Sequence, residues 1–375
     1  MRPTPITADL VRGAAELEST PRGLRPHRLP GWARRQFPDP YLGQMQAQTA
    51  GVRLVLRTAA TALTLTTHPS RLSYRGLPRP RGRIDVAVDG AVVLRDELTG
   101  GDHTELDPAT GAATPHPGLS HTTAVAGLPG RETTVEIWLP HNESVELVAL
   151  HADAPITAAP GPGRRWVHYG SSISQGSNAS GPTDVWTAIA ARAAGVQLRN
   201  LGFGGNALVD PFVARTIRDA PAELISVKLG INVVNADAMR LRAFVPAVHG
   251  FLDTLRDGHP DTPLLLISPL HCGIHEHTPG PGAFDPASIA TGTPRFIATG
   301  DPDDVPRGRL TLTVVRKALA EIAAQRADPN LHHLDGTALY GPADAETHPL
   351  PDGLHPDTAA HRIIGTRFAE YLRRF

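Results

Sequence analysis

The chain has 375 residues, of which 41% are hydrophobic and 19% are charged. These proportions are typical of a folded globular protein, and the length favours two domains over one. The 36 lysine and arginine residues nearly balance the 37 aspartate and glutamate residues, so the formal net charge is −1. A protein without a global charge field has little electrostatic attraction for nucleic acid or anionic lipid, and we expect neither as a partner.

The N-terminus and the cysteine content narrow the class of protein further. Residues 1–20 lack an apolar core of signal-peptide length, and no later stretch is apolar over the length that a bilayer requires, so we expect a cytoplasmic protein. Cys272 is the single cysteine, which excludes an intramolecular disulfide. Three histidines cluster near it, but Glu276 is the one carboxylate among them, and we expect no bound metal ion. These histidines are His271, His275 and His277.

The first half of the chain carries short runs in which apolar and polar residues alternate. This period of two is typical of half-buried β-strands, and no clear helix lies between the runs. They predict an antiparallel β-sandwich within residues 1–153, with a proline-dotted arm at residues 1–45 and a long loop at residues 103–118. Asp89 and Gly90 predict a two-residue hairpin turn. The predicted strands are residues 52–56, 62–66, 84–88, 91–94, 133–139 and 145–150.

The second half shows a different rhythm after a linker. Residues 154–163 contain three prolines and two glycines without any period, as expected of a linker. In residues 164–375, strand-like and helix-like segments alternate, which predicts a doubly wound parallel sheet of the flavodoxin-like, three-layer type. Residues 271–307 interrupt it and are either a wall or lid of the substrate pocket or a disordered surface insertion. The predicted strands are residues 166–169, 196–200, 224–229, 263–268 and 331–334, and the predicted helices are residues 183–194, 211–218, 240–256, 310–326 and 358–374.

Residues suited to acyl chemistry lie at two distant places in this half. Ser172 follows Gly170 just after the first parallel strand, at the sheet edge where α/β folds bind ligands. Asp352 and His355, three residues apart near the end of the chain, could supply an acid and a base. A histidine can take the proton of a serine near neutral pH, and a carboxylate on its other nitrogen fixes the tautomer. Each stretch taken alone could be a simple turn. His168 is better explained as a hydrogen-bonded strand histidine.

Three glycines after the second parallel strand invite a different interpretation. Gly202, Gly204 and Gly205 suggest a dinucleotide-binding loop. The six-residue spacing of that motif fails, however, and no acidic partner for a ribose is evident. We therefore expect no cofactor.

Residues 164–375 resemble the SGNH, or GDSL-type, serine hydrolase superfamily. The first motif of that family is matched by residues 170–176, and three further motifs follow in the family's order. The resemblance implies a covalent acyl-serine mechanism with a preformed oxyanion hole. The implied site residues are the nucleophile Ser172, the oxyanion-hole donors Ser172, Gly205 and Asn232, and the acid and base Asp352 and His355.

Two positions depart from the family pattern. Ser171 stands where the family usually has aspartate, and Val233 stands where a second aspartate would follow the oxyanion asparagine. Neither position is one of the four that name the superfamily. We therefore expect activity, with different local hydrogen bonding.

The β-sandwich narrows the resemblance to two-domain bacterial members. These include carbohydrate esterases and an acyltransferase that moves an aryl acyl group from coenzyme A to a tetracycline-type polyketide. We expect a serine esterase for a small-molecule or carbohydrate ester or thioester, or alternatively an acyltransferase from acyl-coenzyme A to an alcohol on a natural product. A third possibility is a glycan-binding protein with an inactive hydrolase domain, in which Trp32 and Trp138 would stack on sugars. The oligomeric state is left open.

Overall fold

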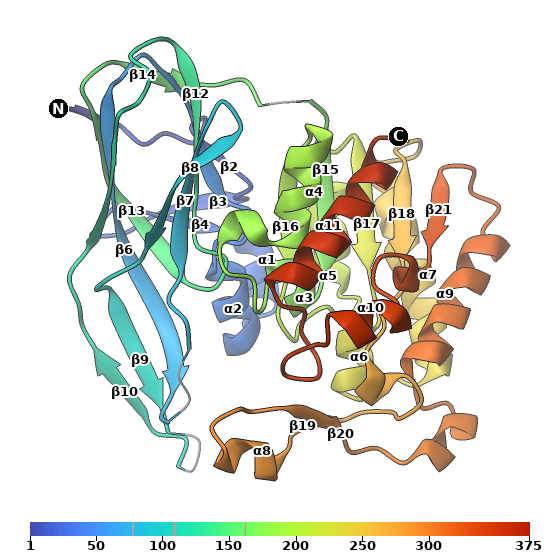
Figure 1. Ribbon diagram of the computed structural model, residues 1–375. Helices are drawn as coiled ribbons and strands as arrows, with labels where there is room; N and C mark the ends of the chain where they lie inside the picture. The colour runs from blue at the N-terminus through green and yellow to red at the C-terminus, as the bar shows by residue number, and fades with distance from the viewer. Residues whose placement is uncertain (77–78, 108–109, 162) are drawn as a thin grey trace. The chain divides into compact units, whose positions relative to one another are not determined.

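The computed structural model describes residues 1–76, 79–107, 110–161 and 163–375 (Figure 1). The chain divides into two compact units, Met1–Pro162 with Gly181–Thr183 and Gly163–Ser180 with Asp184–Phe375. The main division falls near the end of the predicted linker. Within the described ranges, no helix is both long enough and apolar enough to cross a membrane.

The first unit consists mainly of short β-strands, as predicted. Two short helices, α1 at Gly31–Gln36 and α2 at Pro40–Ala47, accompany them. The strands are β1 Arg2–Thr4, β2 Val11–Arg12, β3 Glu16–Ser19, β4 Leu24–His27, β5 Arg53–Thr58, β6 Ala62–Tyr74, β7 Arg83–Val88, β8 Ala91–Glu97, β9 Asp102–Leu106, β10 Ala113–His116, β11 His121–Ala126, β12 Thr133–Trp138, β13 Ser144–Ala152 and β14 Ile156–Ala158.

These strands form two sheets that share one apolar core. The eight-stranded sheet has the order β10-β9-β6-β13-β4-β3, with β1 beside β13 and β11 beside β6. The six-stranded sheet has the order β14-β5-β12-β7-β8, with β2 beside β5. Leu65 and Leu147 of the first sheet lie in the same buried cluster as Leu54 and Ile137 of the second. The predicted β-sandwich is therefore confirmed.

The predicted hairpin turn is also confirmed. Asp89 and Gly90 have φ angles of 48° and 84°, the positive values that a two-residue turn of this type requires at both positions. The turn joins β7 to β8, where Val88 pairs with Ala91.

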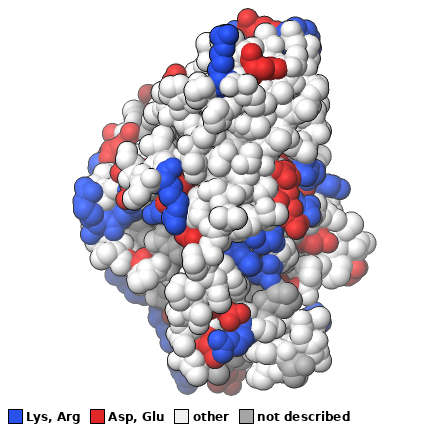
Figure 2. Space-filling model, turned by 90° about the vertical axis from the view of Figure 1, so that its left-hand side faces the viewer, with Lys and Arg blue, Asp and Glu red and all other residues white. Residues whose placement is uncertain are grey.

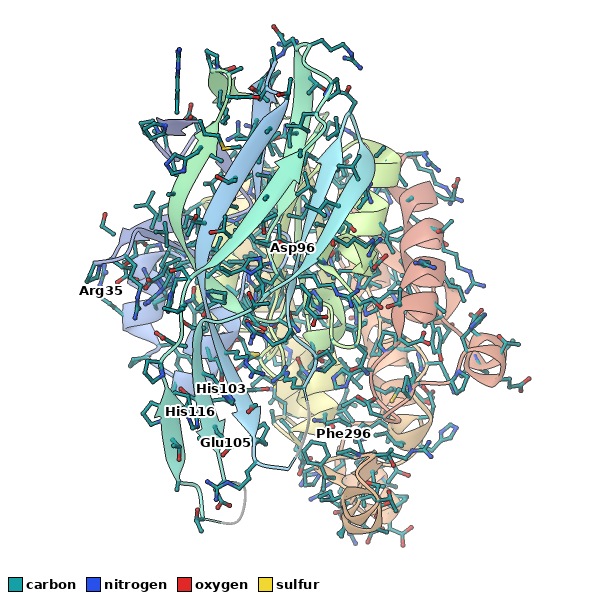
Figure 3. All side chains as sticks on the ribbon, turned by 60° about the vertical axis from the view of Figure 1, so that its left-hand side comes forward. Arg35, Asp96, His103, Glu105, His116 and Phe296 are labelled. Carbon is teal, nitrogen blue, oxygen red and sulfur yellow. The ribbon has the colours of Figure 1, made fainter. Side chains whose placement is uncertain are left out.

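Three expectations for the first unit are wrong. The predicted arm at residues 1–45 contains β1 to β4 as well as α1 and part of α2. The predicted loop at residues 103–118 contains most of β9 and all of β10. The rings of His103 and His116 on these strands stack with centroids 5.3 Å apart (Figure 3). The predicted linker contains β14, which pairs with β5. These strands are only two to five residues long, and β10 is exposed throughout, so they lack the sustained apolar alternation that identifies a half-buried strand. Residues 108–109 and 162 lie outside the described residues.

Charged side chains of both signs are interspersed on the face drawn in Figure 2. Ion pairs of the first unit include Arg75 with Asp107 at 2.9 Å and Arg83 with Glu97 at 3.4 Å. This arrangement agrees with the near-zero net charge of the sequence.

The second unit contains a five-stranded parallel sheet, as predicted (Figure 1). The strands are β15 Arg165–Gly170, β16 Gln197–Gly202, β17 Leu224–Lys228, β18 Leu264–Ile267 and β21 Leu331–Leu334. Their order, β16-β15-β17-β18-β21, is that of a flavodoxin-like doubly wound fold. In such folds the ligand site lies at the carboxyl ends of the strands, where the chain changes direction across the sheet. Here this place is the end of β15.

Helices cover both faces of the parallel sheet. On one face, Trp166 of β15 packs with Trp186 of α4 and Phe368 of α11, and the last two rings meet edge-on at 5.2 Å. On the other face, Tyr169 stacks on Phe251 of α7 at 5.4 Å, and α5 and α9 pack beside α7. The helices of this unit include α3 Ser172–Gln175, α4 Trp186–Ala194, α5 Pro211–Arg218, α6 Ile231–Asn235, α7 Leu241–Gly258, α9 Leu312–Gln325, α10 Pro342–Thr347 and α11 Thr358–Leu372.

The interrupting segment, residues 271–307, has local structure of its own. It contains a hairpin of β19 and β20, in which Phe284 pairs with Phe296 and their ring centroids are 4.5 Å apart. Figure 3 labels Phe296 on this hairpin. The elements of the segment are the 3-10 helices Gly273–His275 and Pro302–Arg307, β19 Gly282–Phe284, α8 Pro286–Ala290 and β20 Phe296–Ala298.

Candidate active site

Ser172 lies at the start of a short helix at the carboxyl end of β15. The strand ends at Gly170, and α3 begins at Ser172, which brings its hydroxyl to the edge of the sheet. Ser171 is the N-cap, and its hydroxyl accepts a hydrogen bond from the Ile173 N–H at 3.3 Å. Gly176 ends the helix with a φ of 118°, a value that favours glycine.

Two glycines allow α3 to pack closely against the sheet. A Cβ atom at Gly170 would lie 2.3 Å from Ser174 Oγ, and one at Gly202 would lie 2.4 Å from the backbone nitrogen of Gln175. Both distances are far shorter than van der Waals contact. A larger residue at either position would therefore displace the helix that carries Ser172.

Buried hydrogen bonds fix α3 in place, and sequence reasoning did not find most of them. Asn200 of β16 donates from Nδ2 to the Ser174 carbonyl oxygen at 2.8 Å and accepts at Oδ1 from the Gly202 N–H at 2.7 Å. His168 is fully buried, and its ring nitrogens are bonded to Ser226 Oγ at 2.7 Å and Ser174 Oγ at 2.8 Å. His168 is thus a hydrogen-bonded strand histidine. The sequence feature that could have indicated these hydrogen bonds is the occurrence of small polar residues at buried strand positions.

Asp352 and His355 lie on the turn before α11, within hydrogen-bonding distance of the serine. His355 Nε2 is 2.9 Å from Ser172 Oγ, and His355 Nδ1 is 2.8 Å from Asp352 Oδ2. The structure therefore brings the three residues together, although 183 positions separate Ser172 from His355. A nucleophile, a general base and an orienting carboxylate require this sequence of contacts.

The Asp352 carboxylate has four hydrogen-bond donors. Oδ1 accepts from the backbone N–H groups of Leu354 at 2.9 Å and His355 at 2.7 Å. Oδ2 is bonded to the His355 ring and accepts from Asn178 Nδ2 at 3.2 Å. Burial opposes ionisation, but the hydrogen bonds and the charge of His355 outweigh it and lower the pKa of Asp352 to about 2. The group is therefore a carboxylate at neutral pH.

Phe296 of the interrupting segment flanks the histidine. Its ring meets the His355 imidazole edge-on with centroids 5.5 Å apart, and its backbone N–H donates to the Asp352 carbonyl oxygen at 2.8 Å. The β19–β20 hairpin therefore supports the turn that carries the acid and the base. Its role as the wall or lid of a pocket stays a prediction.

Three hydrogen-bond donors, on Ser172, Gly205 and Asn232, have no partner among the described residues. No described residue accepts from the backbone N–H of Ser172, the backbone N–H of Gly205 or the Nδ2 group of Asn232. Asn232 accepts at Oδ1 from the Ala207 N–H at 3.0 Å, which fixes its amide and ties α6 to the loop that carries Gly205. Gly205 has a φ of 68°, which favours glycine.

The two departures from the family pattern have local explanations. Ser171 is fully buried, and its hydroxyl caps α3, so a carboxylate is not required for that hydrogen bond. Val233 is fully buried within α6, where an aspartate would need a polar partner to offset its desolvation.

The other histidine candidates are engaged in local contacts. His275 is bonded to Asn235 Oδ1 at 3.1 Å and to the Thr278 carbonyl oxygen at 3.2 Å. His271 lies 3.3 Å from Glu276. In the part of the chain that the structure describes, no group of three or more His, Cys, Asp or Glu residues could hold a metal ion.

Trp138 cannot stack on a sugar in the way that was expected. Its side chain is 1% exposed, Arg53 lies over its ring at 4.6 Å, and its Nε1 donates to Glu136 at 3.1 Å. The indole is thus part of the buried structure of the first unit. Of the two tryptophans expected to stack on sugars, Trp138 is therefore excluded.

Two family models match the sequence. Residues 163–275 match the GDSL-like Lipase/Acylhydrolase family, and residues 10–148 match the SsfX3 N-terminal domain. A comparison with curated proteins gives no match.

Solved structures match nearly the whole chain. The salicylyl-acyltransferase SsfX3 from a tetracycline biosynthetic pathway is 28% identical, with 98% of this chain and 95% of that chain covered and a TM-score of 0.80. A Bacteroides ovatus protein described as a GDSL-like lipase is 20% identical, with 97% and 95% covered and a TM-score of 0.67. A family two carbohydrate esterase from Clostridium thermocellum is 14% identical, with 97% of this chain and 98% of that chain covered and a TM-score of 0.61. The Bacteroides ovatus and Clostridium thermocellum proteins share the fold of this chain. The chain thus matches the SsfX3 N-terminal domain in its first half and the GDSL-like Lipase/Acylhydrolase family in its second, and it is an enzyme of this type.

Proposed function

We propose that the protein is a serine-dependent acyl ester hydrolase that acts on a small-molecule or carbohydrate ester through an acyl-serine intermediate. The observation that carries this proposal is the run of contacts from Asp352 through His355 to Ser172, at 2.8 and 2.9 Å. A serine hydroxyl is a weak nucleophile until a base takes its proton, and this geometry provides the base and the group that orients it.

In the first step, Ser172 Oγ attacks the ester carbonyl carbon while His355 Nε2 accepts the hydroxyl proton. Asp352 accepts a hydrogen bond from Nδ1–H, which leaves Nε2 free as an acceptor and stabilises the imidazolium that forms. The tetrahedral intermediate then collapses, and the leaving alcohol or thiol takes the proton from His355. The acyl group remains on Ser172.

The negative charge that develops on the former carbonyl oxygen needs hydrogen-bond donors. The backbone N–H groups of Ser172 and Gly205 and the side-chain amide of Asn232 are suited to this role, because no described residue accepts from them. Loss of one such donor typically raises the barrier by about 3 kcal/mol.

Water completes hydrolysis when His355 activates it against the acyl-serine. The side chains of His355 and Asp352 are 13% and 20% exposed, so solvent has access to the triad, which supports hydrolysis. The second candidate function is transfer of the acyl group to an alcohol. Its support is the resemblance of both halves of the chain to a salicylyl-acyltransferase at 28% identity.

The test is turnover of p-nitrophenyl esters and acyl-coenzyme A thioesters, with and without alcohol acceptors. We expect Ser172→Ala to lower kcat by about 10⁴-fold or more. Ser171→Ala is the matched control, because it removes only the cap of α3 and costs about 1 kcal/mol of stability. Product analysis distinguishes the two functions, since free acid indicates hydrolysis and a new ester indicates transfer. Full turnover by Ser172→Ala together with loss in Ser171→Ala would show that the nucleophile is the neighbouring serine.

A further inference from the structure

Lys228, the last residue of β17, is a buried cation for which the described residues provide no partner. Lys228 is 2% exposed, and no described residue accepts a hydrogen bond from its ammonium group or forms an ion pair with it. The other lysine of the chain, Lys317, shows the usual arrangement, because its side chain is 79% exposed and lies 3.9 Å from Glu321. Burial of an unpaired ammonium group is costly, so Lys228 requires an explanation.

Burial affects the titration of this lysine but leaves it charged near neutral pH. Desolvation lowers the pKa of Lys228 to about 8. The ammonium also lowers the pKa of the buried His168, although burial is the larger cause of that shift. Both ring nitrogens of His168 are bonded to serine hydroxyls, so the histidine offers Lys228 no lone pair.

Lys228 lines a small cavity whose wall contains chain neighbours of the candidate site residues. The cavity has a volume of about 10 Å³, close to the space that a single water-sized oxygen needs. Three of its apolar wall residues are direct chain neighbours of site residues, since Ile173 follows Ser172, Ile231 precedes Asn232 and Leu354 precedes His355. The wall includes Ile173, Lys228, Ile231, Cys272, Tyr340 and Leu354.

The other polar groups around the cavity are engaged elsewhere. Tyr340 donates its hydroxyl to the His348 carbonyl oxygen at 2.7 Å. Cys272 donates its thiol to the Gly353 carbonyl oxygen at 3.4 Å, and burial raises the pKa of this thiol to about 12, so the sulfur carries no charge.

The carboxylate on the neighbouring loop is also engaged. Glu276 lies 2.5 Å from Arg316 and 3.3 Å from His271, another wall residue, and it accepts from the Cys272 N–H at 2.9 Å. The described residues therefore provide Lys228 with no anion. An anionic group of a bound molecule could supply the counter-charge.

We propose that Lys228 is a specificity residue that binds an acidic oxygen, carboxylate or phenol, on the acyl group that Ser172 accepts. This inference rests on the proposed acyl-serine function. The cavity has room for the acidic oxygen at the ammonium group, and the hydrocarbon part of the acyl group would lie outside it. The small volume favours one oxygen atom at the lysine over a bulky polar group.

The test compares matched pairs of p-nitrophenyl esters that differ by the acidic group, namely 2-hydroxybenzoyl against benzoyl and hemisuccinyl against pentanoyl. For wild-type protein we expect a higher kcat/KM for the acidic member of at least one pair. In Lys228→Met this preference falls by about ten- to a hundredfold, the usual range for loss of a charge-assisted hydrogen bond. Lys317→Met is the matched control, because it removes the other lysine at an exposed position and leaves the preference unchanged.

Lys228→Gln provides a second variant that keeps a polar side chain without the charge, in case Lys228→Met does not fold. The proposal is overturned if wild-type protein prefers the acidic ester in neither pair, or if the preference survives in a folded Lys228 variant. Turnover of the benzoyl and pentanoyl esters by wild-type protein, compared with Ser172→Ala, tests the proposed function separately. Failure of the specificity inference is thus distinguishable from failure of the acyl-serine mechanism.

Discussion

Replacement of Asp352 by asparagine should convert His355 to the wrong tautomer. In wild-type protein, Oδ1 accepts from two backbone N–H groups, those of Leu354 and His355, and Oδ2 faces the His355 ring. An asparagine keeps the two backbone bonds when its oxygen takes the place of Oδ1. Its NH₂ group then faces Nδ1, which must accept, so the ring proton moves to Nε2. A protonated Nε2 cannot take the proton of Ser172.

The size of the loss in activity depends on whether the new amide can flip to its other orientation. Flipping it to restore the correct tautomer would point an NH₂ group at two N–H donors. Each of these donors would lose its acceptor at a cost of about 1–3 kcal/mol, so the flipped state is a minor one. Asp352→Asn thus has the wrong tautomer and also lacks the negative charge beside the imidazolium. We expect its kcat/KM to fall by about 10³- to 10⁴-fold, or roughly 4–5 kcal/mol.

The assay is steady-state hydrolysis of a p-nitrophenyl ester at neutral pH, with the melting temperature measured alongside. Asn178→Ala is the matched control, because it removes one neutral donor to Oδ2 at 3.2 Å and leaves the tautomer intact. We expect this control to lose about tenfold or less. If folded Asp352→Asn retains activity within tenfold of wild-type protein, the tautomer argument is wrong.

Further predictions concern the support of the site and its pH dependence. Gly170→Ala should lower the free energy of unfolding by about 1–3 kcal/mol, because the new Cβ would lie 2.3 Å from Ser174 Oγ; an unchanged denaturation midpoint would contradict this. Phe296→Ala removes the edge contact with His355 and should lower kcat about three- to tenfold with little change in KM, whereas a change in KM alone would argue against a positioning role. Burial lowers the pKa of His361 from its ordinary 6.5 to about 4, so the unfolded chain binds this proton first and stability falls between pH 6.5 and pH 4, by roughly 3 kcal/mol. In denaturant titrations over this range, His361→Gln should show a smaller loss than wild-type protein, and an equal loss would contradict the assignment.

The sequence predicted the parallel sheet, and it pointed to Ser172, Asp352 and His355, which the structure brings together. Both predictions were possible because they rest on a periodic pattern or on motifs in a fixed order along the chain. In buried strands and amphipathic helices the apolar residues recur with a clear period, and each candidate site residue follows a strand end or precedes the last helix. The polar strands β9 and β10 have no apolar face, and α3 is too short to show a helical period, so neither was predicted.

Buried polar contacts were the least predictable part of the site. The bonds of Asn200 to α3 join residues on different strands and loops, and no spacing along the chain reveals them. Lys228 at a strand end has the sequence appearance of a solvated surface residue, and its burial follows from the packing of the loops after β15, β17 and β18. Gly181–Thr183 returns to the first unit because Thr183 donates to the buried Asp85, a contact between residues 98 positions apart.

The most direct test of the mechanism is to trap the acyl-enzyme. Protein mixed with a slowly hydrolysed p-nitrophenyl ester is quenched in acid, and its intact mass and peptides are measured by mass spectrometry. We expect one acyl group per chain, on the hydroxyl of Ser172, and none in His355→Ala under the same conditions. An acyl group on Ser171 or elsewhere, or steady turnover by Ser172→Ala, would contradict it.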